Sequence, residues 1–369
     1  MKIAILGTRG VPNFHGGFEQ FAEFFSIHLI KANHDVYLYS SSSHPYQDKT
    51  FRGVKIIHCY DPEDKIGTFG QFIYDLNCIL DSRKRNFDII LQLGYTSSSI
   101  WTSLMPKGAI IITNMDGLEW KRKKYSLPVR NYLKYAEKIA AIKSHFLVAD
   151  SLGIKEYLKE KYNKESEFIA YGATLFDNPQ ENLLGQYDVV KYKYNMLIAR
   201  IEPENNIETI LDGIVLSGDK TTFLVVGKYH INKFGVYLKK KFNAYQNIRF
   251  LGGVYNLEHL NNLRYYSNLY FHGHSVGGTN PSLLEAMASS ALIIANDNVF
   301  NKSILQKDAL FFKNKNDISN CVRIKKSDRI DLIENNKNKI LKNYSWEIIN
   351  DKYLAFFNEC YRKNKIANK

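Results

Sequence analysis

Short apolar runs alternate with amphipathic stretches along almost the whole chain. The apolar runs have the length and composition of buried β-strands; they occupy residues 2–7, 35–40, 54–60, 87–93, 109–113, 146–149 and 168–171 in the first half, and 195–199, 222–227, 248–251, 269–272, 292–295 and 310–312 in the second. Between them apolar residues recur at helical spacing, most clearly over residues 18–30 and 129–143. Strands that alternate with helices are typical of parallel sheets with helices on both faces. The pattern therefore predicts an α/β fold.

The same pattern divides the chain. Residues 177–191 are polar and have no clear period, and they separate two halves of similar length. A chain of 369 residues is long enough for two domains with separate cores. We expect two tandem Rossmann-like doubly wound domains facing each other across a cleft, at residues 1–180 and 190–345. Ser345 is a good N-cap, so residues 346–369 are expected to form a final helix that packs back on the first domain.

Candidate chemistry is concentrated in a glycine loop after the strand at residues 269–272. Doubly wound folds bind ligands at the carboxyl ends of their strands. The loop residues that would approach a ligand are Gly277, Gly278, Thr279 and Asn280. A helix begins next, at Pro281, so unpaired amides and the positive end of its dipole favour an anion. Glu285 lies one turn inside that helix, where it is placed to accept hydrogen bonds from hydroxyl groups. The local pattern alone fits an ordinary strand-to-helix turn equally well.

A second glycine loop, GTRGVPNFHGGFE at residues 7–19, follows the first strand, and its Gly16 and Gly17 directly precede a helix. A dinucleotide-binding fold needs G-x-G-x-x-G here and an acidic residue at the end of the second strand. Gly7 and Gly10 have the wrong spacing, and the second strand ends without an acid. The sequence therefore disfavours a nicotinamide-dependent dehydrogenase.

Composition excludes several other classes. Apolar residues make up 45% and charged residues 24% of the chain, as in soluble globular proteins. No apolar run approaches the roughly 18 residues that a membrane span needs, and the first residues are typical of a strand and not of a signal peptide. The cysteines are scattered without paired spacing, which argues against zinc and a disulfide framework and favours a reducing cytoplasm: Cys59, Cys78, Cys321 and Cys360.

The net charge of +13 points to an anionic partner. Basic residues cluster at 83–85, 121–124 and 239–241, but the clusters are separate and no nucleic-acid-binding signature accompanies them, so we expect no nucleic acid partner. Each cluster alone is typical of a solvated surface. Together with 25 tyrosines and 22 phenylalanines, the clusters are compatible with peripheral contact with an anionic membrane.

Four motifs carry a family resemblance: GTRGVPNFHGGFE (7–19), NMDGLEWKRKKYS (114–126), ARIEPENNIE (199–208) and HGHSVGGTNPSLLEAMA (272–288). In this order they resemble the GT-B glycosyltransferases, and more narrowly the family-4 retaining enzymes and their bacterial rhamnosyltransferase-like subgroup. The resemblance covers roughly residues 1–345. It implies a transferase that takes a sugar from a nucleotide donor bound by the second domain, with no cofactor and no metal; Asp61–Asp64 is more typical of a polar turn than of a metal site.

The resemblance also assigns donor-binding residues. Glu285 corresponds to the second glutamate of the family's paired acids, which accepts hydrogen bonds from the nucleotide ribose, and Arg200 to the arginine that binds the diphosphate. Gly277 stands where relatives have the first glutamate, and Asn205 where they have a lysine. We expect either backbone amides of the glycine loop or neighbours such as His274 and Asn280 to replace the acid.

Lys228 is the candidate that replaces the missing lysine, although a lysine in a loop is as often only solvated. Gly16 and Gly17 are expected to face the donor loop from the other domain.

The motif at residues 114–126 supplies candidate catalytic residues. Relatives have a histidine near this position that contacts the donor sugar, whereas this chain has Asp116 and Glu119. Asp116 is placed to orient the acceptor hydroxyl or take its proton; the alternative is a simple Asp-Gly turn. His274, directly before the glycine loop, is the third candidate, and His15 is a candidate acceptor contact.

These features predict a cytoplasmic, metal-independent glycosyltransferase that transfers a sugar with retention. The expected acceptor is a glycan or a polyprenyl-diphosphate-linked oligosaccharide of bacterial surface polysaccharide synthesis, reached at the inner face of the plasma membrane. Rhamnose from a deoxythymidine diphosphate donor is the first hypothesis, and a UDP-hexose or UDP-N-acetylhexosamine the second. A non-catalytic nucleotide-sugar-binding protein is the alternative from another class.

Overall fold

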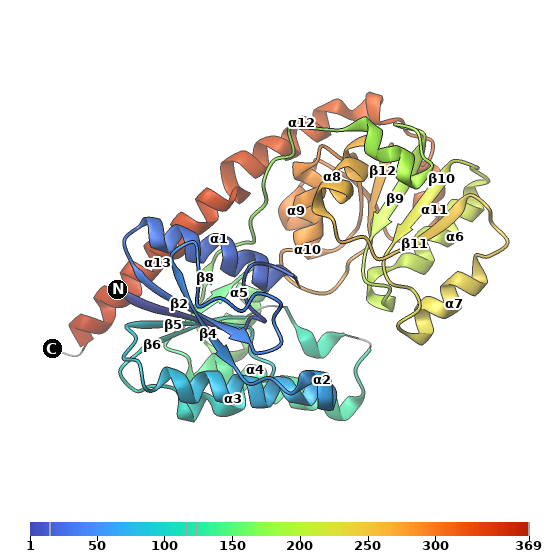
Figure 1. The fold of residues 1–369 in the computed structure, drawn as a ribbon. Helices are drawn as coiled ribbons and strands as arrows, with labels where there is room; N and C mark the ends of the chain where they lie inside the picture. Colours follow the sequence, from blue (N-terminus) through green and yellow to red (C-terminus); the bar gives the residue numbers. More distant parts are fainter. Residues whose placement is uncertain (15, 116, 123, 368–369) are drawn as a thin grey trace. The chain divides into compact units, whose positions relative to one another are not determined.

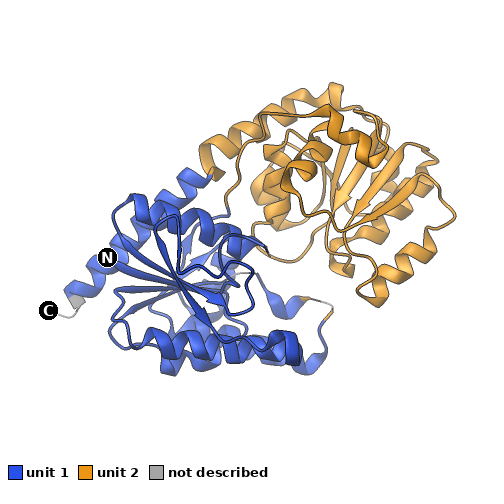
Figure 2. Ribbon diagram, viewed as in Figure 1, with its two compact units in different colours: residues 1–121, 125–171, 346–369 blue, residues 122–124, 172–345 orange. Residues whose placement is uncertain are grey.

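The computed structural model describes residues 1–14, 16–115, 117–122 and 124–367. The chain forms two compact units, each with its own sheet (Figures 1 and 2). Unit 1 comprises residues 1–121, 125–171 and 346–369, and unit 2 comprises residues 122–124 and 172–345. The tandem doubly wound α/β fold predicted from the alternation of elements is confirmed.

Unit 1 contains an eight-stranded sheet with the order β3-β4-β2-β1-β5-β6-β7-β8. Its strands are β1 (Lys2–Leu6), β2 (Asp35–Ser41), β3 (Thr50–Phe51), β4 (Val54–Cys59), β5 (Ile89–Leu93), β6 (Ile110–Asn114), β7 (Phe146–Ala149) and β8 (Glu167–Phe168). Neighbours are parallel except β3 and β4, which pair as an antiparallel hairpin at the edge. The sequence did not indicate β3, because two residues are too few to show a period. The strand order reverses between β1 and β5, which is the topological switch point of this sheet.

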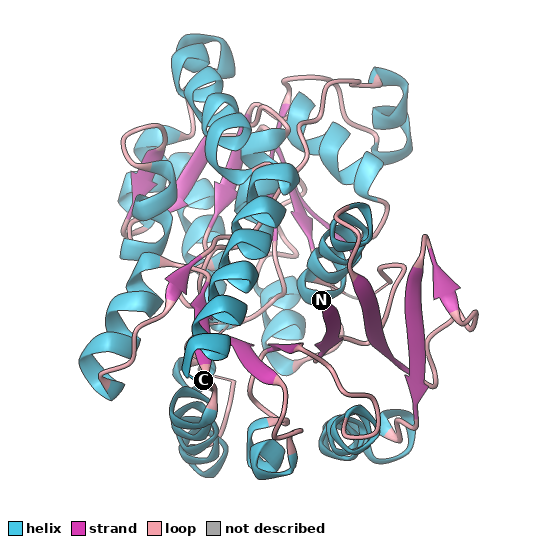
Figure 3. Cartoon of the chain, turned by 90° about the vertical axis from the view of Figure 1, so that its left-hand side faces the viewer, coloured by secondary structure: helices cyan, strands magenta, loops and turns pink. Residues whose placement is uncertain are grey.

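The helices of unit 1 cover its sheet on both faces (Figure 3). They are α1 (Gly17–Lys31), α2 (Glu63–Ile66), α3 (Gly70–Ser82), α4 (Leu127–Lys143), α5 (Leu152–Tyr162) and the final helix α13 (Trp346–Ala367). Aromatic rings join α13 to α1: Phe21 lies 4.6 Å from Tyr353, and Phe25 lies 5.3 Å from Phe357. The last helix of the chain therefore completes the core of unit 1. Among the described helices, none combines the length and apolar character needed to cross a membrane.

Unit 2 contains a six-stranded parallel sheet with the order β11-β10-β9-β12-β13-β14. Its strands are β9 (Tyr194–Ile198), β10 (Thr222–Val226), β11 (Ile248–Gly252), β12 (Leu269–His272), β13 (Ile293–Asn296) and β14 (Leu310–Phe312). Its helices are α6 (Ile207–Ser217), α7 (Lys233–Lys241), α8 (Leu257–Tyr266), α9 (Pro281–Ala288), α10 (Val299–Leu305), α11 (Lys315–Cys321) and α12 (Ile330–Lys339). The order reverses between β9 and β12, so the loops that follow these two strands flank the switch point.

Two sequence predictions differ from the structure. The strand expected at residues 168–171 is only β8, because the chain leaves the sheet edge and the Tyr171 hydroxyl donates to the Gly17 carbonyl at 2.9 Å. The polar segment at 177–191, expected to be a linker, contains a 3₁₀ helix, η4 (Glu181–Tyr187), that packs on α8. There the Tyr187 hydroxyl lies 2.8 Å from His259 Nδ1. Polar residues that pack through side-chain hydrogen bonds give no apolar period, so the sequence pattern hid this element.

Candidate functional site

The glycine loop of unit 2 leads from β12 into α9 as the sequence indicated. Gly277 has φ +126°, a backbone conformation that favours glycine, and a Cβ there would meet open space. Asn280 is the N-cap of α9: its side chain accepts from the Ser282 amide at 3.0 Å, and Pro281 occupies the first helical turn. Thr279 is buried, whereas Gly278 is partly exposed. The loop thus delivers a capped helix start to the carboxyl edge of the sheet.

Backbone contacts join this loop to the loop that follows β9. The Ser275 amide and hydroxyl both donate to the carbonyl of Glu204, at 3.2 and 2.7 Å. The Asn206 side chain donates to the Gly273 carbonyl at 2.8 Å. A Cβ on Gly273 would lie 2.0 Å from the Asn205 carbonyl oxygen, so only glycine allows this approach. The two loops at the switch point therefore form one connected edge.

A buried arginine holds Glu285. Arg264 on α8 is 1% exposed and donates to Glu285 Oε2 at 2.6 Å, while the Glu285 side chain keeps 19% exposure. The same guanidinium donates to Asn261 at 3.0 Å and to Ser282 at 3.3 Å. The Ser282 hydroxyl also lies 2.9 Å from the Tyr270 hydroxyl of β12. Glu285 is therefore fixed from the core side and reaches solvent on the other.

The predicted cationic residues follow neighbouring strands. Arg200 comes after β9 and is exposed; Lys228 comes after β10, is exposed, and lies 5.0 Å from the ring of Tyr255. Asn205 is buried, and its side chain donates to the Arg200 carbonyl at 2.7 Å. The asparagine at the expected lysine position therefore shapes the loop around Arg200 and adds no charge.

Two histidines lie at the start of the glycine loop. The rings of His272 and His274 stack with centroids 4.4 Å apart. Burial lowers the pKa of His272 well below its usual value; burial and the nearby Arg200 charge lower the pKa of His274 to about 3. Both imidazoles are neutral near pH 7. In the described part of the chain, both ring nitrogens of His272 and Nδ1 of His274 have no hydrogen-bond partner.

Glu204 belongs to the motif at residues 199–208, but the sequence assigned it no role. It lies in the short 3₁₀ helix η5 (Pro203–Asn205), and its side chain is 3% exposed. Both carboxylate oxygens are buried, and among the described residues neither has a hydrogen-bond partner. Burying such a group without a partner costs free energy. Nothing in the local sequence shows that Glu204 is buried, so only the structure distinguishes it.

Unit 1 carries the other predicted residues. Gly16 is the N-cap of α1 with an extended backbone, and Gly17 is the first residue of that helix. Glu119 begins the 3₁₀ helix η3 (Glu119–Lys121), where the Trp120 indole donates to the buried Glu137 at 3.0 Å. Glu137 also accepts from the hydroxyls of Tyr157 and Tyr162, at 2.6 and 2.7 Å. The candidates Asp116 and His15 lie outside the described residues.

The carboxyl edge of the unit 1 sheet holds a buried acid that the sequence analysis missed. Asp75 on α3 accepts from the Ser97 hydroxyl at 2.6 Å, and burial raises the pKa of Asp75 to about 6. Nearby, Arg9 of the first glycine loop pairs with Glu63 at 2.5 Å. The available signal was an acid within the largely apolar segment GQFIYDLNCIL, where Asp75 lies beside Tyr74, Cys78 and Ile79, all of them buried.

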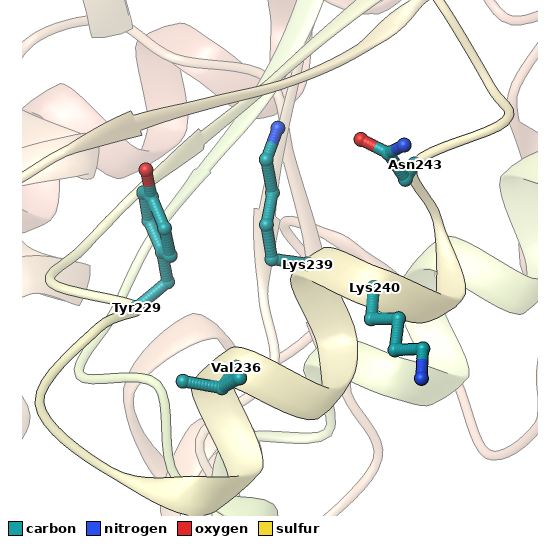
Figure 4. Close-up of a pocket in the computed structure, with 5 residues that line it drawn as sticks. All are labelled: Tyr229, Val236, Lys239, Lys240 and Asn243. Atoms are coloured by element: carbon teal, nitrogen blue, oxygen red, sulfur yellow. The ribbon is translucent and has the colours of Figure 1, made fainter.

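One cavity beside the end of β10 is separate from these residues. It has a volume of about 300 Å³ and is lined by Tyr229, Val236, Lys239, Lys240 and Asn243 (Figure 4). None of the predicted donor-binding residues lines it. In the described part of the chain, no group of three or more His, Cys, Asp and Glu side chains is placed to hold a metal ion.

Comparisons with known proteins agree with this architecture. The family described as "Domain of unknown function (DUF1972)" matches residues 1–174, less than half of the chain. No curated protein matches. Among solved structures, sucrose-phosphate synthase from Thermosynechococcus elongatus superposes with a TM-score of 0.79 at 15% identity, covering 98% of this chain and 99% of its own.

Two further structures give the same result. HepE from Anabaena, in complex with UDP and glucose, has a TM-score of 0.73 at 13% identity, with coverage of 97% and 100%. Trehalose-6-phosphate synthase from Burkholderia multivorans has a TM-score of 0.73 at 9% identity, with coverage of 100% and 98%. At such low identity these similarities show the fold: the chain has the GT-B architecture of these enzymes.

We predict that the Arg264–Glu285 ion pair stabilises unit 2. Glu285→Ala should lower the free energy of unfolding by about 3–5 kcal/mol, because it leaves the guanidinium buried without its counter-charge. The double variant Arg264→Met, Glu285→Leu should recover most of this loss. Urea unfolding measures both, with Glu334→Ala, which removes a surface ion pair to Lys337, as the nearly neutral control. If Glu285→Ala is as stable as the parent, the ion pair does not stabilise unit 2.

Asp75 should make stability depend on pH. The pKa of Asp75 is about 6 in the folded protein, above its ordinary value of 3.8, so the folded state binds the proton of this carboxyl more tightly than the unfolded state does. This proton binding stabilises the folded state fully below pH 3.8, and the stabilisation is lost as the pH rises through 6. Asp75→Asn should therefore raise the free energy of unfolding at pH 7.5 by about 1–2 kcal/mol and give little gain at pH 4. Urea unfolding at both pH values tests this. The exposed Asp64→Asn is the control, and an equal gain at both pH values would refute the role of Asp75 ionisation.

Proposed function

We propose that this protein is a glycosyltransferase that takes a sugar from a nucleotide diphosphate donor. The observation that carries the proposal is the switch-point edge of unit 2. There Arg200, the capped start of α9 and Glu285 come from neighbouring segments of a fold shared with nucleotide-sugar-dependent enzymes. HepE was solved with UDP-glucose, and trehalose-6-phosphate from E. coli with UDP-2-fluoro glucose.

In this proposal the donor-binding residues stabilise the negative charge of the leaving nucleoside diphosphate. Cleavage of the anomeric carbon–oxygen bond leaves a nucleoside diphosphate, whose growing negative charge must be stabilised. Arg200 and the amides at Gly277, Gly278 and Thr279 would take that diphosphate, with Lys228 as a second cation. Glu285 would accept hydrogen bonds from the ribose hydroxyls, and Arg264, which donates to Glu285 Oε2, would keep its carboxylate oriented.

In place of the acid missing at Gly277, the sugar would meet uncharged hydrogen-bonding groups of the glycine loop and its neighbours. His274 is uncharged near pH 7, so it would act as a hydrogen-bonding group. Rhamnose from a deoxythymidine diphosphate donor remains the first hypothesis, from the rhamnosyltransferase-like resemblance. The complexes of HepE favour UDP-glucose as the donor to test beside it, together with UDP-N-acetylhexosamine.

The acceptor would lie at unit 1. A new bond forms from the acceptor oxygen to the anomeric carbon, retaining its configuration, and the hydroxyl proton must leave. Asp116 and Glu119 are the proposed residues that orient this hydroxyl or receive its proton, and Gly16 and Gly17 would face the donor. The proposed acceptor is a glycan or a polyprenyl-diphosphate-linked oligosaccharide in surface polysaccharide synthesis.

Helix α4 offers a surface for a lipid-linked acceptor. Leu127 at its start is 72% exposed, and Tyr135 is exposed as well. Lys134 lies 4.7 Å from the ring of Trp120, and Lys121 lies 5.5 Å from it. Exposed apolar groups with lysines beside an indole suit the interface of an anionic membrane. In the basic cluster at residues 83–85, by contrast, Arg85 pairs with Asp81.

The donor site should bind nucleotide sugars without a metal. UDP-glucose, deoxythymidine diphosphate-rhamnose and UDP-N-acetylglucosamine are compared by calorimetry and then for transfer, with and without a chelator. Arg200→Gln should weaken binding of the donor by about 10–100-fold, because a charge-assisted hydrogen bond is lost. The exposed Lys240→Gln is the control. No binding by any donor would reject the proposal, binding without turnover would identify a non-catalytic binding protein, and an inverted product would reject retention.

Membrane contact through α4 is tested by sedimentation with phosphatidylglycerol vesicles. Lys134→Gln should weaken binding about fivefold, since one lysine near an anionic surface contributes about 1 kcal/mol. Leu127→Gln should weaken it to a similar extent by removing apolar contact. Leu216→Gln, an exposed leucine on α6 of unit 2, serves as the control. If the parent and the three variants bind vesicles equally, or if binding does not weaken as the salt concentration rises, α4 is not the membrane-binding surface.

A further inference from the structure

A second cavity lies at the opposite edge of the unit 2 sheet. Its volume is about 690 Å³, in the range of small-molecule sites. Lys193, Thr221 and Asn268 line it, and each directly precedes a strand: β9, β10 and β12. The other wall is the turn between α11 and α12, with residues 322–327 and Ile330. Because these residues lie at the amino ends of the strands, the cavity is distinct from the donor edge at the carboxyl ends.

The lining of this cavity is strongly basic. Four basic side chains contribute to it: Lys193, Arg323, Lys325 and Lys326. Within the described residues, none of the four forms an ion pair with a carboxylate. The lining also includes Asp219, but one of its oxygens already accepts from the amide and hydroxyl of Thr221, at 3.1 and 2.9 Å. Cations around a cavity without carboxylate partners favour an anionic ligand.

Lys326 is the most unusual of the four. It is only 8% exposed, its ammonium group donates to the carbonyl of Tyr265, and it lies 5.5 and 5.2 Å from the rings of Tyr192 and Tyr265. The Asn268 side chain anchors its backbone amide at 2.9 Å. Burial lowers the pKa of Lys326 to about 7. A buried lysine with no counter-ion is costly, and an anion in the cavity would remove that cost.

We propose that this cavity binds a small phosphorylated molecule free in solution, with its phosphate on Arg323 and Lys326 and its organic part against the apolar lining. Ile324, Ile330 and Val322 provide the apolar lining, and the partly exposed ring of Tyr192 extends it. A bare inorganic ion would leave these groups unused, so a phosphate ester fits better than phosphate alone. This inference does not rest on glycosyl transfer, because the cavity and its charges exist whatever the donor edge binds.

The binding test uses phenyl phosphate as the ester and the full chain as the protein. Calorimetry should detect one site whose affinity falls at least about tenfold in Arg323→Gln and further when Lys326→Met is added, since each change removes a charge-assisted contact. Lys240→Gln, at the other cavity, and Arg200→Gln, at the donor edge, should bind as the parent does. Loss of binding in Arg200→Gln alone would mean that the ester binds at the donor edge, and the proposal would fail.

A proton measurement separates a role of Lys326 from simple loss of structure. Inorganic sulfate is the probe, because it does not titrate near neutral pH. At pH 8 Lys326 is largely neutral, so sulfate binding should take up protons, seen as a binding enthalpy that varies with the buffer. Lys326→Met should abolish the uptake, and its unfolding transition shows that it is folded. Sulfate binding without proton uptake would contradict the proposed contact.

Vesicles distinguish a free ligand from a lipid headgroup. Phosphatidylglycerol vesicles should bind equally to the parent and to Arg323→Gln with Lys326→Met. If phenyl phosphate does not bind and vesicle binding depends on Arg323 and Lys326, the cavity binds a lipid headgroup, and the proposal of a free ligand is wrong.

Discussion

The Arg264–Glu285 ion pair is the constraint on which the switch-point edge of unit 2 depends. Arg264 is buried on α8, Ser282 and Tyr270 are linked to it, and Glu285 carries its charge on α9. A guanidinium with 1% exposure needs a carboxylate nearby, since an uncompensated buried charge is far more costly than a solvated one. The ion pair therefore fixes the position of the Glu285 carboxylate on α9. A single interaction thus joins the stability of unit 2 to the geometry of a residue proposed to bind the ribose.

The glycine loop shows how amide side chains fix the switch-point edge of unit 2. Asn205 and Asn206 use their side chains to bond carbonyl groups at Arg200 and Gly273, so the two loops at the switch point are fixed by amides. A lysine at position 205 would supply a positive charge but not the side-chain amide that donates to the Arg200 carbonyl. Gly277 has a left-handed backbone and faces open space, while Glu204 and His272 are buried with polar atoms that have no hydrogen-bond partner in the part of the chain that the structure describes. The loop therefore keeps its shape through backbone and amide contacts.

Residues distant in sequence hold the loops of unit 1 in the same way. Tyr353 of the final helix accepts from the Asn114 side chain at 2.9 Å, directly before the segment that contains Asp116 and Glu119. Glu137 fixes Trp120 from α4. The two sheets also differ in what their edges offer: the carboxyl edge of unit 2 presents helix starts and Arg200, and its amino edge presents the cavity around Lys326. One doubly wound sheet thus provides two chemically different surfaces.

The sequence by itself determined the fold class, nearly all the strands, and the position of the glycine loop before α9, because periodicity, glycine and proline act locally. It predicted β12 at residues 269–272 with the bounds that the structure has. It also placed Arg200 and Glu285 near one edge, since parallel strands end together. Only the tertiary structure decided that Arg264 neutralises Glu285, that Asn205 closes a loop, that Asp75 is buried, and that Lys326 lines a cavity. Each of these features is a contact between residues that are 5 to 61 positions apart in the sequence. Such contacts result from packing and desolvation, which the local pattern of apolar and polar residues does not encode.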